Sequence, residues 1–254
     1  MRILLTNDDG VNAKGLGVLE RLARTLSDDV WIVAPMEEQS GTGRSLTLTR
    51  PIRLKRFDDR RFAVTGTPTD AVMMALAEIM KDGPPDLILS GVNRGANLGE
   101  DVHYSGTVSA AMEGALAGIR SIALSQRYPQ LAPGERVSFA CAEAWGERVI
   151  RSLIDAPWVP RTVINVNFPP CAPDAVEGVR VVPHGIRDYG RVRMDQRHDP
   201  RGFPYYWMAM GRQAERPSDG SDLDAAADGF VTVTPLQLDM THHGSIAALR
   251  QALA

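Results

Sequence analysis

Hydrophobic and polar positions follow two different periods along the first two-thirds of the chain. Short apolar runs bounded by polar turns indicate strands that are buried on both faces. Between these runs, apolar residues recur at helical spacing, which predicts amphipathic helices. We expect strands at residues 2–6, 30–35, 85–93, 121–125 and 162–169, and helices at residues 17–27, 68–83, 106–119 and 135–155. This alternation predicts an α/β fold with a mainly parallel sheet that has helices on both faces.

Two stretches depart from this alternation. Residues 46–57 and 61–66 predict a β-hairpin that precedes the helix beginning near Pro68. From about residue 184 to 222 the sequence is rich in Gly, Arg and aromatic residues and has no helical period. A flexible surface loop is the simplest interpretation, but the run Tyr205–Met208 is too apolar to remain in water. We therefore expect an extended β-hairpin arm that buries these side chains against a partner subunit.

The C-terminal end returns to regular structure. Residues 230–236 predict a strand, and residues 244–253 predict a terminal helix. No internal repeat or low-complexity tract divides the sequence, and 254 residues are enough to bury one sizeable core. We expect residues 1–254 to form a single domain, with the arm and the terminal helix serving oligomerisation.

Composition narrows the functional classes. The sequence is 44% hydrophobic and 23% charged, which is typical of a globular protein. Its net charge of -3 gives no electrostatic reason to expect a nucleic-acid or membrane partner. The N-terminal apolar run is too short for a signal peptide. Cys141 and Cys171 have no metal or redox spacing, which suggests a reducing compartment. A cytoplasmic enzyme or binding protein is therefore expected.

Three polar loops follow predicted strands and would share one edge of the sheet. In open α/β sheets, ligands bind outside the carboxyl ends of the strands. The first loop carries Asp8 and Asp9, the second spans residues 37–45, and the third spans residues 90–111. In the third loop, residues 105–107 precede a helix, whose free backbone N–H groups and dipole favour an anion such as phosphate. The alternative is that the serine at position 105 only caps the helix.

Two carboxylates beside a phosphate site would repel the phosphate. A divalent cation removes this conflict, because it binds the Asp oxygens on one side and the phosphate on the other. Since the candidate ligands are oxygens, they suit Mg²⁺, Mn²⁺ or Ca²⁺ better than a structural zinc. The alternative is an ordinary polar turn over residues 7–10. The sequence lacks the motifs of dinucleotide-binding, Walker A, G-x-S-x-G and cysteine-phosphatase proteins. The haloacid-dehalogenase type of phosphatase uses a D-x-D motif, whereas Asp8 and Asp9 are adjacent.

Six ordered motifs resemble those of the SurE family of survival-protein nucleotidases. From about Arg2 to Leu238 they are ILLTNDDG, SGTGRSLT, GTPTDAV, SGVNRGANLGEDVHYSGTVSAAMEG, DPRGFPYYW and DGFVTVTPL. The resemblance implies a Rossmann-like core and a metal-dependent phosphatase that acts on nucleoside 5′- and 3′-monophosphates and on short polyphosphate. It also implies a homodimer or homotetramer whose subunits exchange the C-terminal region. The alternative function is a nucleotide-binding regulator that uses the same site without turnover.

The resemblance also assigns residues to roles. The family's metal ligands correspond to Asp8, Asp9, Ser40 and Asn93, and imply one Mg²⁺ or Mn²⁺ ion per subunit. Its phosphate-binding segment corresponds to Asn97, Ser105, Gly106 and Thr107. We expect Asp8 and Asp9 to be catalytic as well, with one of them accepting a proton from the attacking water. An aspartyl-phosphate intermediate is the alternative. Ala71 replaces a Cys common in the family, and the tail after the TPL sequence, which ends at residue 236, diverges from the family pattern.

Several polar residues in these loops have no assigned role. Asp101 could belong to the site or only orient its loop. His103 could be a proton donor or an ordinary loop residue. Arg44 and Arg94 could bind phosphate or face solvent. The pair of histidines at positions 242 and 243 is typical of a surface segment rather than of a metal site.

Overall fold

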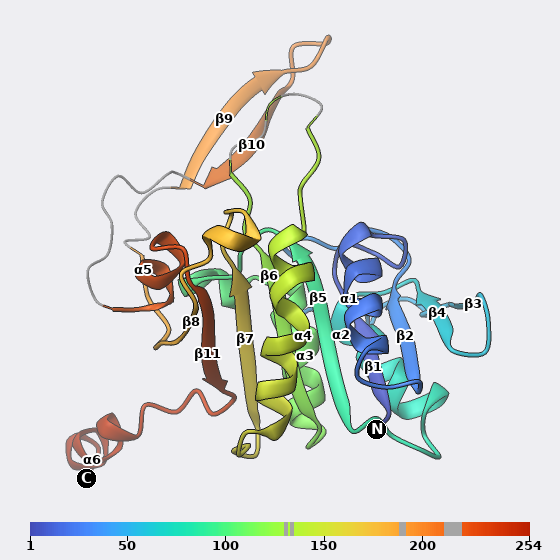
Figure 1. Cartoon of the computed structure of the whole chain (residues 1–254). Coiled ribbons are helices and arrows are strands. Elements are labelled where there is room, and N and C mark those ends of the chain that lie inside the picture. Colours follow the sequence, from blue (N-terminus) through green and yellow to red (C-terminus); the bar gives the residue numbers. More distant parts are fainter. Residues whose placement is uncertain (130–131, 133–134, 188–191, 211–219) are drawn as a thin grey trace.

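A nine-stranded sheet forms the body of the protein. The computed structural model describes all residues except 130–131, 133–134, 188–191 and 211–219 (Figure 1). In sheet order, the strands are β3 (Leu54–Arg56), β4 (Arg61–Val64), β2 (Val30–Pro35), β1 (Ile3–Thr6), β5 (Leu87–Arg94), β6 (Arg120–Gln126), β7 (Thr162–Phe168), β11 (Val231–Gln237) and β8 (Val179–Val181). The pairings β3–β4 and β7–β11 are antiparallel, and the other pairings are parallel. The predicted mainly parallel α/β sheet is therefore confirmed.

Helices cover both faces of this sheet. Helices α1 (Lys14–Arg24) and α4 (Ala140–Asp155) pack on one face, and α2 (Pro68–Met74) and α3 (Gly106–Leu116) pack on the other (Figure 1). Because side chains alternate along a strand, Ile3 and Leu5 join the core beneath α1 and α4. Leu4 points the opposite way and packs against Val72 of α2. This two-sided burial explains why the central strands are almost entirely apolar.

Local sequence signals fix where the helices begin. Thr67 accepts a hydrogen bond from the Asp70 backbone N–H, and Asp70 accepts one from the Thr67 N–H, so the pair forms a capping box. Pro68 occupies the first turn of α2, where its missing N–H costs nothing. Helix α2 continues as a π-helical turn over Ala75–Ile79, and the predicted helix over residues 68–83 therefore ends early.

Several element boundaries differ from those predicted. Helix α1 begins and ends three residues before the predicted 17–27, and α4 begins at Ala140 rather than at residue 135. Of the predicted strand 46–57, only β3 forms. The short strand β8 and helix α5 (Asp222–Ala227) were not predicted, since each is too short to show a period. The number and order of the long elements agree with the prediction.

The predicted arm is a two-stranded hairpin that projects from the body (Figure 1). Strands β9 (Val192–His198) and β10 (Pro204–Met210) pair antiparallel to each other and form a separate sheet. The predicted arm, residues 184–222, includes positions 188–191 and 211–219, which lie outside the described residues. Helix α6 (His243–Ala252) extends away from the body at the other end of the molecule, as the predicted terminal helix.

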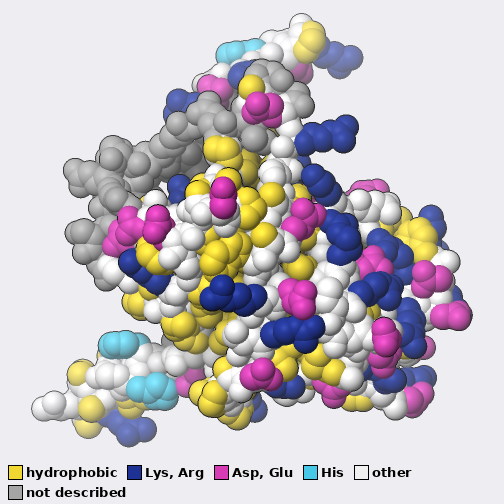
Figure 2. Space-filling model, viewed as in Figure 1, with side chains coloured by type: hydrophobic (Ala, Val, Ile, Leu, Met, Phe, Trp, Pro, Cys, Tyr) yellow, Lys and Arg dark blue, Asp and Glu magenta, His cyan; other side chains and the backbone are white. Residues whose placement is uncertain are grey.

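Charge is distributed evenly over the face that carries α1 and α4. Figure 2 shows basic and acidic side chains interspersed over the body on this face, with the hairpin and α6 protruding from it. Within the described parts of the chain, no helix has both the length and the apolar character needed to cross a membrane.

Candidate active site

The predicted loops meet at the carboxyl ends of β1 and β5, which are parallel neighbours. The backbone N–H of Gln39, in the second loop, donates to the carbonyl oxygen of Asp8 over 2.8 Å. The backbone N–H of Arg94, in the third loop, donates to Oδ2 of Asp9 over 2.9 Å. Residues far apart in the sequence therefore surround the two carboxylates, as expected from their positions at strand ends.

Asp8 is the more deeply buried carboxylate, with only 4% of its surface exposed. Its Oδ1 accepts a hydrogen bond of 2.5 Å from the Thr107 hydroxyl of α3. Burial raises the pKa of Asp8 to about 6, and the nearby charge of Asp9 adds to the rise, whereas the bond from Thr107 opposes it. The protein therefore holds a negative charge in a place that disfavours it, unless a cation compensates the charge.

Asp9 is linked to the second loop through charged side chains. Burial raises the pKa of Asp9, and the hydrogen bond and charge of Arg94 oppose the rise. Arg94 also donates from Nη2 to Oε1 of Glu38 over 3.0 Å. The same Glu38 oxygen accepts a 2.9 Å hydrogen bond from Oγ of Ser40. Ser40, a predicted metal ligand, thus reaches Asp9 through Glu38 and Arg94, and its side chain lies in an exposed position.

The N-terminus of α3 lies directly against Asp8. A Cβ atom added to Gly106 would lie 2.8 Å from the Asp8 Cβ and 3.0 Å from Cγ of Pro68, so only glycine allows this approach. Ser105 caps the helix by accepting the Val108 backbone N–H over 3.0 Å. The capping interpretation of Ser105 is thus correct for its side chain. The first backbone N–H groups of α3 remain at the helix end beside the carboxylates, where an anion is favoured.

Asn93 and Asn97 occupy different settings. The Asn93 side chain donates from Nδ2 to the Gly95 carbonyl over 3.0 Å, so its Oδ1 is the atom it could offer to a cation. Asn97 is buried, and its Nδ2 donates to Oγ of Ser125 over 2.8 Å. Its backbone N–H donates to Oδ1 of Asn167 over 2.8 Å, which fixes the main chain at this point. The structure gives Asn97 a clear structural role, and its phosphate contact stays a prediction.

Sequence reasoning missed the residues that hold Asn97. Asn165 and Asn167 both donate to the Asn97 carbonyl oxygen, over 2.8 and 3.1 Å. They are two positions apart on β7, so both side chains point to the same side of the strand. Two buried asparagines in an otherwise apolar strand were a signal that could have identified them, because buried amides need partners.

The residues left open in the sequence fall in three places. Asp101 orients its loop by pairing with Arg187, with 3.0 Å between its Oδ1 and Nη1 of the arginine. His103 and Arg44 line a cavity of about 420 Å³ between α3 and the end of β11. The histidines at positions 242 and 243 are exposed and bond to Ser245 and Asp239, respectively.

The donor set fits a hard divalent cation. The predicted ligands offer two carboxylates, a hydroxyl and an amide oxygen, which suit Mg²⁺ or Mn²⁺. Burial raises the pKa of Asp8 and of Asp9, so a bound cation would favour the charged form of both carboxylates. In the part of the chain that the structure describes, no three His, Cys, Asp or Glu side chains gather in a cluster that could hold a metal ion. A metal here would therefore rely on neutral oxygens, water or substrate to complete its coordination.

A cavity of about 470 Å³ opens beside the carboxylates. Asp9, Glu38 and Arg94 line it on the side of the candidate metal site. Tyr128 and Phe139 contribute aromatic rings to its wall, and the Lys14 ammonium lies 5.9 Å from the centre of the Phe139 ring. The cavity is large enough for a small organic ligand.

Fold and site together define an α/β protein with a carboxylate pair and a helix N-terminus at the carboxyl edge of a parallel sheet, a design suited to binding phosphate through a cation. The chain belongs to the SurE family: the family model described as "Survival protein SurE" matches residues 3–191. The predicted family membership is therefore confirmed.

Relatives of this chain match it along nearly its whole length. A protein of Rhizorhabdus wittichii named 5'-nucleotidase SurE is 67% identical over 98% of both chains. A protein of the same name from Erythrobacter litoralis is 56% identical, again over 98% of both chains. Among solved structures, the SurE protein from Aquifex aeolicus is 35% identical, has a TM-score of 0.86, and matches all of both chains.

Proposed function

We propose that this SurE-family protein is a metal-dependent 5′-nucleotidase that hydrolyses nucleoside monophosphates to nucleoside and phosphate. The observation that carries the proposal is the contact between Asp8 and the N-terminus of α3, which Gly106 makes possible. This contact joins a cation-binding group to an anion-binding group within one site. The name 5'-nucleotidase, which the relatives bear, supports the same activity class.

Each predicted site residue has a role in this proposal. Asp8, Asp9, Ser40 and Asn93 hold one Mg²⁺ or Mn²⁺ ion. When bound, the ion neutralises phosphate charge and lowers the pKa of water. The first N–H groups of α3 and the segment from Asn97 to Thr107 bind phosphate oxygens. Asp8 or Asp9 accepts the proton of the attacking water, since both carboxylates lie at the same strand end.

The nucleoside part of the substrate extends into the cavity beside Asp9. Tyr128 offers an exposed ring on which a base can stack, and Arg94 lies between the cavity and the metal site. This arrangement supports action on 5′- and 3′-monophosphates and on short polyphosphate, because recognition centres on phosphate. Both cysteines are free, which supports the proposed cytoplasmic location. We propose a homodimer or homotetramer as the active form.

Turnover separates this enzyme from its alternative, a nucleotide-binding regulator. Phosphate release is measured with purine and pyrimidine 5′-monophosphates, a 3′-monophosphate, tripolyphosphate and glycerol phosphate, each with Mg²⁺ or Mn²⁺. We expect multiple turnovers on the 5′-monophosphates and slower release from glycerol phosphate, which lacks a base. Nucleotide binding without phosphate release would identify the regulator instead.

A further inference from the structure

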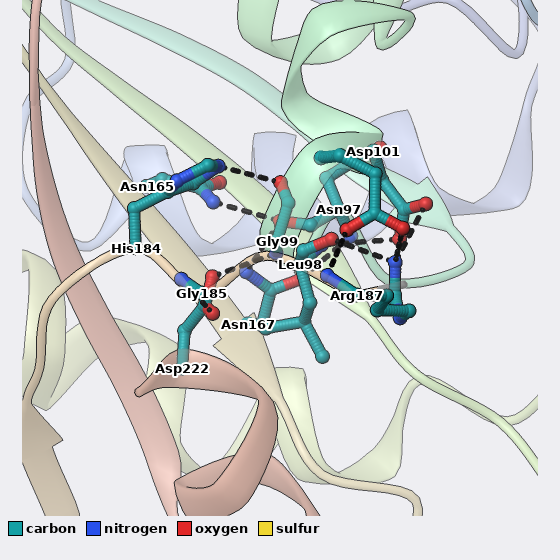
Figure 3. Close-up of polar contacts among 11 residues, drawn as sticks. Asn97, Leu98, Gly99, Asp101, Asn165, Asn167, His184, Gly185, Arg187 and Asp222 are labelled. Carbon is teal, nitrogen blue, oxygen red and sulfur yellow. Dashed lines mark hydrogen bonds and ion pairs between the residues drawn. The ribbon is translucent and has the colours of Figure 1, made fainter. Parts of the chain in front are cut away.

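The segment that follows Asn97 is held by residues from the C-terminal third of the chain. Figure 3 shows Leu98, Gly99 and Asp101 surrounded by His184, Gly185, Arg187 and Asp222. These four residues flank the root of the hairpin arm, because β9 begins at Val192 and α5 begins at Asp222. Nothing in the predicted reaction requires them, so their contacts need another explanation.

Arg187 contacts three residues of this segment, Leu98, Glu100 and Asp101. Its Nη1 donates to the Leu98 carbonyl over 3.2 Å and to Oε1 of Glu100 over 3.1 Å. Its Nη2 donates to Oδ2 of Asp101 over 3.1 Å, and its backbone N–H donates to Oε2 of Glu100 over 2.9 Å. The planar guanidinium presents several N–H donors in a fixed fork and can reach all three acceptors at once, whereas a lysine ammonium is a single compact charge.

Asp222 fastens the same segment from the other side. Its fully buried carboxylate accepts the Gly99 backbone N–H through Oδ2 and the Gly185 backbone N–H through Oδ1, each over 2.9 Å. His184 adds a 2.8 Å hydrogen bond between its Nε2 and the Gly99 carbonyl. A Cβ on Gly185 would lie 2.5 Å from the Ser221 Oγ, and a Cβ on Gly99 would lie 3.3 Å from the Gly185 carbonyl oxygen, so these three segments of the chain are in direct contact.

We propose that Arg187 and Asp222 are positioning residues for phosphate binding, which couple the root of the arm to the phosphate-binding segment. The segment they hold, Leu98–Asp101, lies between Asn97 and the cap residue Ser105 of α3. Fixing it therefore fixes the approach of the chain to the helix N-terminus. The inference rests on the proposed function for the identity of the ligand, but not on turnover.

Charge gives a second reason for this role. Glu100 and Asp101 place two carboxylates beside a segment that must accept a phosphate, and Arg187 pairs with both. Without the Arg187 side chain, these carboxylates would repel phosphate and the loop would lose three hydrogen bonds. The proposed metal ligands Asp8, Asp9, Ser40 and Asn93 lie in or beside the loops that follow β1, β2 and β5, and the described contacts of Arg187 are to Leu98, Glu100 and Asp101 instead. Loss of the Arg187 side chain should therefore weaken phosphate binding and leave metal binding nearly unchanged.

The test compares two affinities in the full-length protein. The Kd of inorganic phosphate is measured by calorimetry in the presence of saturating Mn²⁺, and the Kd of Mn²⁺ is measured by electron paramagnetic resonance. We expect Arg187→Met to weaken phosphate binding at least tenfold and to change Mn²⁺ binding less than twofold. Arg187→Lys should recover part of the loss, because it restores the charge but not the fork of donors. Asp222→Asn, which removes one of two acceptors, should give a loss of three- to tenfold.

Arg151→Met is the matched control. Arg151 also pairs with a glutamate and a backbone carbonyl, Glu147 and Thr25, but it joins α4 to the end of α1 away from the site. The Arg151→Met variant should bind phosphate with an affinity within twofold of the wild-type value. If Arg187→Met does not fold, Arg187→Lys and Asp222→Asn still decide the outcome by the same two affinities.

Three results would overturn the inference: phosphate affinity within twofold of wild type in the Arg187 and Asp222 variants, equal weakening of Mn²⁺ and phosphate, or no phosphate binding by the wild-type protein with Mn²⁺. A wild-type protein that binds phosphate but releases none from nucleotides would refute the proposed nucleotidase. In that case the phosphate and Mn²⁺ affinities of the variants would still test whether Arg187 and Asp222 position the phosphate-binding segment.

Discussion

Asp8 combines deep burial with a neighbouring carboxylate, and both features penalise its charge. Its pKa of about 6 lies above the ordinary value of 3.8, so protonation is easier in the folded chain than in the unfolded chain. The metal-free folded state is therefore penalised at pH values above about 6, and the penalty disappears as the pH falls below about 4. A shift of about two units corresponds to roughly 3 kcal/mol as an upper bound.

Asp8→Asn should relieve this penalty in metal-free protein. The side-chain oxygen still accepts the Thr107 hydroxyl, but the charge is gone. At pH 7.5 in EDTA, we expect a free energy of unfolding that is unchanged or raised, by at most a few kcal/mol. The difference should become small near pH 4, where wild-type Asp8 is protonated in the folded state and about half protonated in the unfolded state. Urea denaturation at the two pH values measures this difference in the free energy of unfolding. A variant that is clearly less stable than wild type at pH 7.5 would refute the claim that burial penalises the Asp8 charge.

Gly106→Ala tests the close approach of α3 to Asp8. The new Cβ would lie 2.8 Å from the Asp8 Cβ, so the helix or the carboxylate must move. We expect at least a tenfold loss of nucleotidase activity and a stability loss of about 1–3 kcal/mol, typical of overpacking.

Gly17→Ala, in the middle of α1, is the control for the glycine substitution. Its Cβ would meet only Nη1 of Arg21, at 3.9 Å, so activity should not change. Stability should rise by about 0.5–1 kcal/mol through higher helix propensity. Equal activity in both alanine variants would show that α3 need not touch Asp8.

The site residues that could be predicted from sequence are those next to strand ends. Asp8 and Asp9 closely follow the apolar run of β1, and the α3 cap ends the loop that follows β5, so topology brings them to one edge. Arg187 and Asp222 could not be predicted this way, because they reach the segment from Leu98 to Asp101 across more than 80 residues. Their contacts depend on the tertiary path of an irregular segment, which has no periodic signal.

At the scale of elements, long periodic segments were predicted well and short or irregular ones were not. The strand 30–35 was correct to the residue, because both ends are marked by polar turns. The N-terminus of α4 was placed too early, since Glu135 and Arg136 suit a helix but lie in a loop. Tertiary packing decided the π-helical turn at Ala75–Ile79, which no propensity indicates.

The β9–β10 hairpin exposes apolar side chains that a monomer would leave in water. Phe203, Tyr206 and Met208 are exposed, as is Trp207, with 58% of its surface accessible. Each Å² of apolar surface buried on assembly contributes about 25 cal/mol. We expect replacement of Val192–Met210 by a short Gly-Ser linker to give smaller assemblies, as measured by light scattering. The linker variant keeps Arg187, so phosphate affinity should be reduced less than in Arg187→Met.

A point variant and a control refine the hairpin test. Trp207→Ser should shift the oligomer toward smaller species at low concentration. Val159→Ser, an exposed apolar site between α4 and β7, should not do so. An unchanged oligomer after loss of the hairpin would mean that assembly uses another surface.

At the scale of the whole molecule, the proposed function places the nucleoside in the cavity beside Asp9. Its lining includes the rings of Tyr128 and Phe139, and the ring of Tyr128 can stack on any base. We expect purine and pyrimidine monophosphates to be hydrolysed with kcat/KM values within roughly a thousandfold, which corresponds to about 4 kcal/mol. Tyr128→Ala should raise KM for all of them by several-fold and leave glycerol phosphate unaffected. A larger ratio between bases would reveal a base-specific pocket.

The central claim is that Asp8 and Asp9 hold a catalytic divalent metal. The most direct measurement is phosphate release from a nucleoside 5′-monophosphate by metal-stripped protein, before and after addition of Mg²⁺ or Mn²⁺, in wild type, Asp8→Asn and Asp9→Asn. Stripped wild-type protein should be inactive and should recover with metal, and each variant should stay at least a hundredfold slower, since metal stabilisation amounts to several kcal/mol. Turnover in EDTA at the metal-replete rate, or full activity in either variant, would contradict the claim.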